Sequence, residues 1–143
     1  MLKNRSVPTD AVLPHVTYEN VAEAIPWLTN AFGFTEHYRY GDPVAGAQMS
    51  LEGAWIMLNS ARPGRASPAK SGCTTQCLTI FVDDVAAHFD KTKAEGCKIV
   101  EDVHEAVYGE RQYGVEDVEG HLWIFSQHIL DVDPPEWGAT IAG

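Results

Sequence analysis

The sequence has 143 residues, of which 45% are apolar and 21% charged, and this composition predicts one soluble globular domain. Twenty acidic against ten basic residues give a formal net charge of −10, which repels phosphate backbones and argues against a nucleic-acid partner. No apolar stretch approaches the roughly 18 residues of a membrane span, so no membrane partner is expected. Three cysteines without disulfide-scaffold spacing, and an N-terminus without a signal peptide, predict a cytoplasmic protein.

The first half of the chain predicts one helix among four strands. The strands are expected at residues 12–18, 34–41, 44–51 and 54–59. Asn20 is expected to cap the helix, Glu23 to complete a capping box, and Gly33 to end it. Pro26 lies inside this helix and removes one backbone hydrogen bond, so it is expected to kink or shorten the helix.

Residues 60–75 interrupt this pattern. The segment is rich in proline, glycine and serine, which is typical of a flexible linker. It carries Arg62, Arg65 and Lys70 but no acidic residue, although the whole chain is acidic. Two interpretations stay open, a solvated connector and a lid that closes over an anionic ligand.

The second half predicts the same order of elements. Its strands are expected at residues 77–82, 97–102, 111–116 and 121–128. Asp84 is expected to cap a helix over residues 85–95 that ends at Gly96. His121 follows the turn before the last strand and is expected to be exposed. Trp137, in the tail, is expected to pack on its own domain or on a neighbouring subunit.

The two halves are therefore similar. Asn20 corresponds to Asp84, Gly33 to Gly96, and a Glu-Gly turn precedes the last strand of each half. Internal similarity of this kind predicts a single domain, residues 1–143, that is built from two related modules with a binding site between them. Its parts are expected to be a first module at 10–59, the linker at 60–75, a second module at 76–130 and a tail at 131–143.

Three segments in this order resemble the vicinal oxygen chelate superfamily, which includes glyoxalase I, bleomycin-resistance proteins and ring-cleaving dioxygenases. The segments are residues 31–34 (AFGF), 82–85 (VDDV) and 108–123 (YGERQYGVEDVEGHLW), and the resemblance covers roughly residues 10–130. It implies an α+β fold in which two βαβββ modules form curved mixed sheets around a cavity, with the helices outside. It also implies a homodimer.

Strand alternation then predicts which side chains enter the cavity that the resemblance implies, because successive side chains face opposite sides of a sheet. The expected ligand-binding residues are His15, Thr17, Trp55, Met57, Asn59, Thr79, Phe81, Ile124 and Ser126. The residues expected to pack toward the helices are Val16, Tyr18, Leu78, Ile80 and Val82.

Metal-dependent members of the superfamily place four ligands, usually His, Gln or Glu, in this cavity. The resemblance carries those positions onto Leu13, Met57, Cys77 (or Gln76) and Ile124. Leu13 and Ile124 offer no ligand atom and Met57 offers only a soft thioether, whereas the divalent cations of these enzymes need imidazole nitrogen or carboxylate oxygen. We therefore expect no metal and no cofactor.

Two functions remain as hypotheses. The first is binding of a small, neutral and planar organic molecule without a metal. The alternative is a metal-dependent or metal-free lyase, isomerase or dioxygenase, for which His15 is the best catalytic candidate. His15 could instead be a hydrogen-bonded strand histidine, and Trp55 with Met57 could form either a wall for the ligand or ordinary core.

Overall fold

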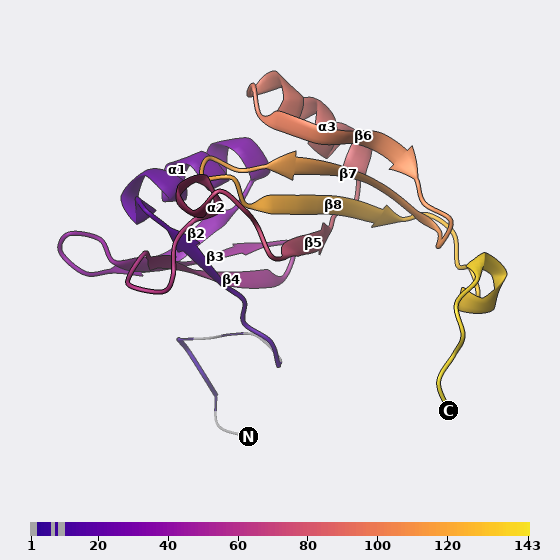
Figure 1. Ribbon diagram of the computed structural model, residues 1–143, viewed down its shortest axis with the longest axis horizontal. Coiled ribbons are helices and arrows are strands. Elements are labelled where there is room, and N and C mark those ends of the chain that lie inside the picture. The colour runs from indigo at the N-terminus through magenta and orange to yellow at the C-terminus, as the bar shows by residue number, and fades with distance from the viewer. Residues whose placement is uncertain (1–2, 7, 9–10) are drawn as a thin grey trace. The chain divides into compact units, whose positions relative to one another are not determined.

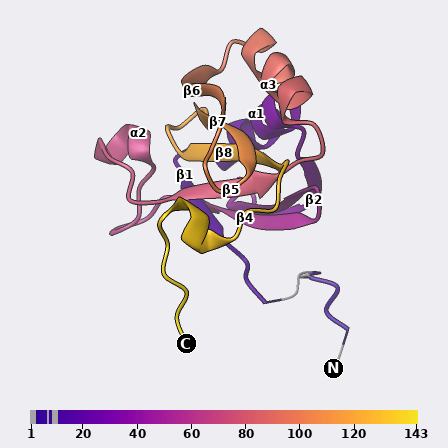
Figure 2. The same cartoon turned by 90° about the vertical axis from the view of Figure 1, so that its right-hand side faces the viewer.

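Figure 1 shows the computed structural model of the protein, which describes residues 3–6, 8 and 11–143. The chain divides into two compact units, Met1–Thr75 with Val118–His121, and Gln76–Asp117 with Leu122–Gly143. Each unit contains one four-stranded mixed sheet with a helix against one face (Figures 1 and 2). This arrangement confirms the predicted α+β class. The predicted first residue of the first module, residue 10, lies outside the described residues.

The first unit follows the order strand, helix, strand, strand, strand. Its elements are β1 (His15–Tyr18), α1 (Val21–Phe32), β2 (Thr35–Tyr40), β3 (Gly46–Leu51), β4 (Ala54–Ser60) and α2 (Pro68–Ser71). The strands lie in the order β1-β4-β3-β2, with β1 parallel to β4 and the other pairs antiparallel. Parallel strands need a long connection between them, and the connection from β1 to β4 includes α1.

Helix α1 forms from local signals that the sequence displays. The side chain of Asn20 accepts the backbone N–H of Glu23 at 3.0 Å, and Gly33 ends the helix in the left-handed conformation, with φ 91°. Pro26 does not shorten the helix, so of the two predicted effects only the kink stays a prediction. The helix continues to Phe32 because its apolar side chains are buried and outweigh one missing backbone bond. These buried residues are Val21, Ala24, Ile25, Leu28, Ala31 and Phe32.

The start of α1 is held by a glutamate from the far end of the sequence. Both oxygens of Glu119 accept backbone N–H bonds, from Glu19 at 2.6 Å and from Asn20 at 3.0 Å. Glu119 therefore takes the position predicted for the Glu23 side chain, so the capping box forms only in its Asn20 half. A negative charge before the first turn also suits the positive end of the helix dipole.

The neighbouring His121 is not the exposed turn residue that the sequence predicted. Its Nε2 lies 2.6 Å from the carbonyl oxygen of Thr17, and its ring meets that of Tyr18 edge-on at 5.0 Å. The prediction was wrong because these partners come from β1, more than a hundred residues earlier in the chain.

The segment expected to be a flexible linker contains a short helix, α2, just after Ser67. The backbone N–H of Ser67 donates to Glu19 Oε2 at 2.8 Å, and that of Ala69 donates to the carbonyl oxygen of Glu119 at 2.9 Å. Arg62 and Arg65 form a backbone bridge in the same segment. Residues 67–69 are thus bonded to the start of α1 and to the 118–121 loop.

The second unit repeats the order of the first. Its elements are β5 (Cys77–Phe81), α3 (Val85–Ala94), β6 (Lys98–Glu105), β7 (Glu110–Glu116), β8 (Leu122–His128) and the 3-10 helix η1 (Pro134–Trp137). The strand order β5-β8-β7-β6 matches that of the first sheet, and β5 is parallel to β8. The two predicted βαβββ modules are therefore confirmed. Trp137 packs edge-on against Tyr108 at 5.9 Å, within its own unit.

The core of the second unit contains two buried polar contacts among aromatic rings. Trp123 donates its indole N–H to Asp117 Oδ2 at 2.9 Å. The hydroxyl of Tyr113 donates to Thr92 Oγ1 at 3.0 Å, and its oxygen lies 2.6 Å from His88 Nδ1. Tyr113 is fully buried, and this burial raises the pKa of its phenol. A hydroxyl with these partners stabilises the unit only while it keeps its proton.

We expect Tyr113 to make the protein less stable at high pH. The unfolded chain releases the tyrosine proton above about pH 10, whereas the folded chain, with its raised pKa, retains it. Unfolding therefore becomes easier as pH rises past 10, by about 1.4 kcal/mol per pH unit. Urea unfolding between about pH 9 and 11 should show a loss of stability that steepens above pH 10 in the wild type and is smaller in Tyr113→Phe. Equal slopes would contradict the assignment.

None of the helices in the described part of the chain is both long enough and apolar enough to span a membrane.

Candidate ligand-binding site

The predicted site residues fall into two sets, one on each sheet. His15 lies opposite Met57, and Thr17 lies opposite Asn59, in the paired strands β1 and β4. Trp55 precedes Met57 by two residues, so it shares the same face of β4. Val16 and Tyr18, between these positions, are buried on the other face of β1, at 6% and 0% exposure. The predicted alternation in the first unit is therefore confirmed.

The other four residues lie on the second sheet. Thr79 is opposite Ile124, and Phe81 is opposite Ser126, in β5 and β8. Phe81 is 55% exposed, whereas Ser126 is fully buried. The hydroxyl oxygen of Ser126 has no hydrogen-bond partner among the described residues. The alternation holds here too, because Ile80 is buried between exposed Thr79 and Phe81.

The register extends the first set across all four strands of its sheet. One row runs from His15 through Met57 and Gln48 to Tyr38. A second row runs from Thr17 through Asn59 and Gly46 to Tyr40. The Tyr40 ring occupies the space that a side chain at Gly46 would need. We call this face, opposite α1, the ligand face.

A β-bulge in β2 decides which side chains of that strand reach the ligand face. Glu36 pairs with Met49 and Tyr38 pairs with Gln48, so His37 is an extra residue on one strand. Without the bulge, Glu36 and Tyr38 would face the same side. With the bulge, Tyr38 lies on the ligand face, whereas Glu36 lies on the opposite face of the sheet, the side of α1, which we call the helix face.

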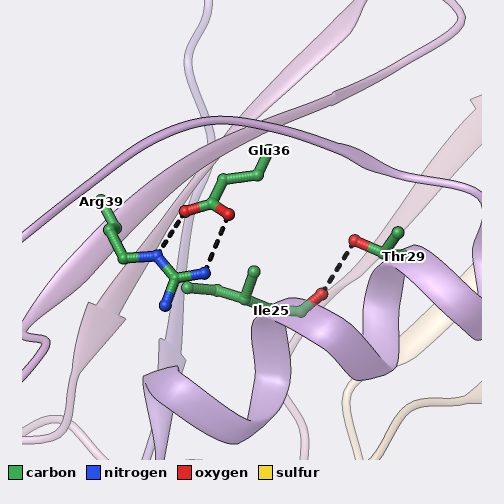
Figure 3. A network of polar contacts seen from close by, with 4 residues as sticks. All are labelled: Ile25, Thr29, Glu36 and Arg39. Atoms are coloured by element: carbon green, nitrogen blue, oxygen red, sulfur yellow. Dashed lines mark hydrogen bonds and ion pairs between the residues drawn. The ribbon is translucent and has the colours of Figure 1, made fainter.

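Figure 3 shows the two charged side chains of β2, Glu36 and Arg39, close to α1. Arg39 donates two hydrogen bonds to Glu36, from Nε at 2.6 Å and from a terminal nitrogen at 2.9 Å, next to Ile25 and Thr29 of α1. The hydrogen bond from Arg39 lowers the pKa of Glu36, so the carboxylate stays ionised. The charged pair of β2 is thus on the helix face, and the ligand face keeps neutral groups.

The centre of the ligand face is a hydrogen-bonded cluster around Gln48, which is fully buried. Gln48 Oε1 lies 2.6 Å from His37 Nδ1, and Gln48 Nε2 donates to Met57 Sδ at 3.5 Å. The hydroxyl oxygen of Tyr38 lies 3.8 Å from the same sulfur and 3.1 Å from the carbonyl oxygen of Ser6, which is the nearer acceptor for its proton. The His37 ring also meets Trp55 edge-on at 5.3 Å. Three residues of this cluster were not among the predicted ligand-binding residues: His37, Tyr38 and Gln48.

His15 forms a separate pair at the β1 side of the sheet. The side-chain nitrogen of Asn59 lies 2.8 Å from His15 Nδ1. An amide nitrogen only donates, so the neutral imidazole accepts at Nδ1 and carries its own proton on Nε2. The catalytic role considered for His15 stays a prediction.

The positions that hold metal in the metal-dependent members do not fit a metal here. Leu13 and Ile124 have no ligand atom, and the thioether sulfur of Met57 accepts an N–H from Gln48, so of the four positions only Cys77 (or Gln76) brings an ordinary ligand atom. Within the described part of the chain, no group of three or more His, Cys, Asp or Glu side chains could hold a metal ion.

Comparison with known proteins agrees with this fold. Residues 12–125 match the sequence profile of the Glyoxalase/Bleomycin resistance protein/Dioxygenase superfamily. The chain belongs to this superfamily. It is 28% identical over 140 residues to the uncharacterized protein Mb0911c of Mycobacterium bovis, and the match covers 92% of each chain.

Solved structures of the superfamily's fold are also similar to the chain. TioX from Micromonospora sp. ML1 is 27% identical, with a TM-score of 0.69 over 87% of this chain and 100% of TioX. The fosfomycin resistance protein FosX from Listeria monocytogenes is 16% identical, with a TM-score of 0.64 over 85% of this chain and 95% of FosX. At that identity FosX supports the fold alone, and TioX supports it over nearly the whole chain.

Proposed function

We propose that the protein binds a small, neutral and planar organic molecule on the ligand face of the first sheet. The observation that carries this proposal is the absence of Asp, Glu, Lys and Arg from that face, among the described residues of β1 to β4. The face instead presents aromatic, hydroxyl, amide and thioether groups. These come from His15, Thr17, Tyr38, Tyr40, Gln48, Ser50, Trp55, Met57 and Asn59.

Two physical arguments connect this surface to its ligand. Burying a charge without a partner charge is costly, so a neutral surface favours a neutral ligand. Trp55 and Met57 are neighbours on one face of β4, and aromatic rings with thioethers give large contact area to flat molecules. Membership of a superfamily whose description includes bleomycin resistance proteins is consistent with small-molecule binding.

Thr79, Phe81, Ile124 and Ser126 remain predicted ligand contacts. Their support is the same alternation that holds in the first sheet, together with the buried hydroxyl of Ser126, which no group in the described ranges satisfies. The expected homodimer also remains a prediction.

The first test is direct binding by calorimetry with flat neutral aromatics such as naphthalenes and coumarins. We expect saturable binding that Trp55→Ala weakens about tenfold, because it removes the largest contact surface. His15→Ala should weaken it by only about threefold, since it removes one exposed hydrogen-bonding group. Trp27→Phe, on α1, is the matched control and should change nothing.

A preference for charged ligands would contradict the proposed site. If small dicarboxylates or phosphates bind tightly and aromatics do not, the neutral ligand is wrong. The basic residues Arg62, Arg65, Lys70 and Arg111 then become the place to look.

The alternative function is a lyase, isomerase or dioxygenase of the same superfamily. The His37–Gln48 contact favours it, because an imidazole on the ligand face could move a proton without a metal. Elemental analysis of the purified protein separates the two. Stoichiometric zinc, nickel, iron or manganese that is lost in His15→Ala would favour the metal-dependent enzyme over the proposed binding function.

A further inference from the structure

We propose that His37 determines which planar ligands the site accepts, because its Nε2 accepts a hydrogen bond from a hydroxyl or N–H group at the ligand edge. This inference rests on the proposed function and deepens it. The predicted class is therefore phenols, enols and N–H heteroaromatics, rather than bare hydrocarbons or aryl ethers.

The argument begins at Met57, whose sulfur can accept hydrogen bonds but cannot donate them. Gln48 Nε2 lies 3.5 Å from this sulfur and donates to it, and the Tyr38 hydroxyl approaches it at 3.8 Å. Since the amide nitrogen of Gln48 faces the sulfur, the amide oxygen of Gln48 faces His37.

An amide oxygen only accepts, so His37 Nδ1, at 2.6 Å from Gln48 Oε1, is the donor of that bond. A neutral imidazole carries one proton. Because Gln48 holds this proton on Nδ1, the lone pair of the ring is on Nε2. The second nitrogen of His37 is therefore an acceptor.

The buried position of Gln48 supports this orientation of its amide. Gln48 is 0% exposed, so no bulk water reaches its amide to compensate for the opposite orientation. Turning the amide would direct its oxygen at the Met57 sulfur, which places two acceptors face to face and gives up the N–H bond to that sulfur. Gln48 is thus a positioning residue that fixes the proton on one side of the His37 ring.

The position of His37 places this acceptor where a planar ligand would lie. The bulge at residue 37 brings the imidazole ring of His37 beside two aromatic rings. Its centroid lies 5.3 Å from that of Trp55 and 5.1 Å from that of Tyr38. The side chain is exposed, and Nε2 has no hydrogen-bond partner among the described residues. An aromatic ligand in contact with Trp55 would therefore have its edge within reach of an unpaired acceptor.

His15 provides the contrast. Asn59 directs an N–H at His15 Nδ1, so the neutral ring of His15 presents a donor at Nε2. The two imidazoles of the ligand face therefore have opposite hydrogen-bonding polarity. Of these two imidazoles, His37 is the one that favours ligands that donate.

The experiment compares three ligands with the same ring system at neutral pH by calorimetry: 2-naphthol, 2-methoxynaphthalene and naphthalene. We expect 2-naphthol to bind about tenfold more tightly than the other two, since only it can donate to His37. In His37→Phe, which keeps an aromatic ring beside Trp55, the three affinities should agree within about twofold. His15→Phe is the matched control and should retain the preference.

A second measurement determines which nitrogen of His37 carries the imidazole proton. Nitrogen-15 NMR of the imidazole should show His37 protonated at Nδ1 in the wild type, and a mixture of tautomers in Gln48→Met. A wild-type His37 protonated at Nε2 would overturn the inference. Equal binding of the three ligands would overturn it as well, while leaving the proposed function intact. If none of the three binds, the proposed function fails and this inference fails with it.

Discussion

Replacing Glu119 with alanine is expected to lower the free energy of unfolding by about 3 kcal/mol. Glu119 is only 9% exposed, and its carboxylate accepts the backbone N–H groups of Glu19 and Asn20. Its removal leaves both donors without this acceptor at the start of α1, where the helix also loses a favourable charge. Urea unfolding measures the loss, and the amide protons of Glu19 and Asn20 should exchange faster with solvent.

Two variants sharpen this test. Glu119→Gln keeps one acceptor oxygen and should lose about half as much stability, since an amide can satisfy one of the two donors. Glu136→Ala removes the same charge from an exposed position and should change stability by less than about 0.5 kcal/mol. Equal stability of Glu119→Ala and Glu136→Ala would show that the two N–H bonds contribute nothing.

The second large effect is expected for Gly109→Ala, which should destabilise the protein by about 4 kcal/mol. Gly109 has a φ of 89°, which strains any residue with a side chain. Its carbonyl oxygen accepts the N–H groups of Ile129 and Leu130, at 2.8 and 3.1 Å. This bonding brings the Leu130 carbonyl so close that a methyl group at residue 109 would collide with it.

The chain offers a matched control in Gly96, which has a similar φ of 81° but open space around the missing side chain. Gly96→Ala should cost only about 1 kcal/mol, which is the strain of the backbone conformation alone. The difference between the two variants measures the collision with Leu130. If both cost the same, the segment at residues 129–130 moves aside freely and the turn does not hold it.

Local signals were sufficient for most of the fold. Asn20 and Asp84 cap α1 and α3 with their side chains, and Gly33 and Gly96 adopt the left-handed conformation after each helix. These features depend on neighbours within four residues, so the sequence displays them directly. The repeated order of elements made the superfamily recognisable for the same reason.

The candidate site was only partly accessible from the sequence. Alternation in β1 and β4 placed His15, Thr17, Trp55, Met57 and Asn59 on one face, because the side-chain period of a strand is fixed. Extending it to β3 would also have found Gln48, which pairs with Met57. His37 could not be found in this way, because the bulge in β2 breaks the alternation on which the method depends.

The sequence by itself determined the two longer helices, α1 and α3, the strands, their repeated order and the faces of the regular strands, since each follows from backbone geometry and near neighbours. The tertiary structure alone decided the partners of Glu119, the packing of His121 on β1, and the contact between His37 and Gln48. Each of these depends on groups that are distant in the sequence or on strand register. A hydrogen bond forms only where folding brings a donor and an acceptor within about 3 Å, and no local pattern encodes that distance.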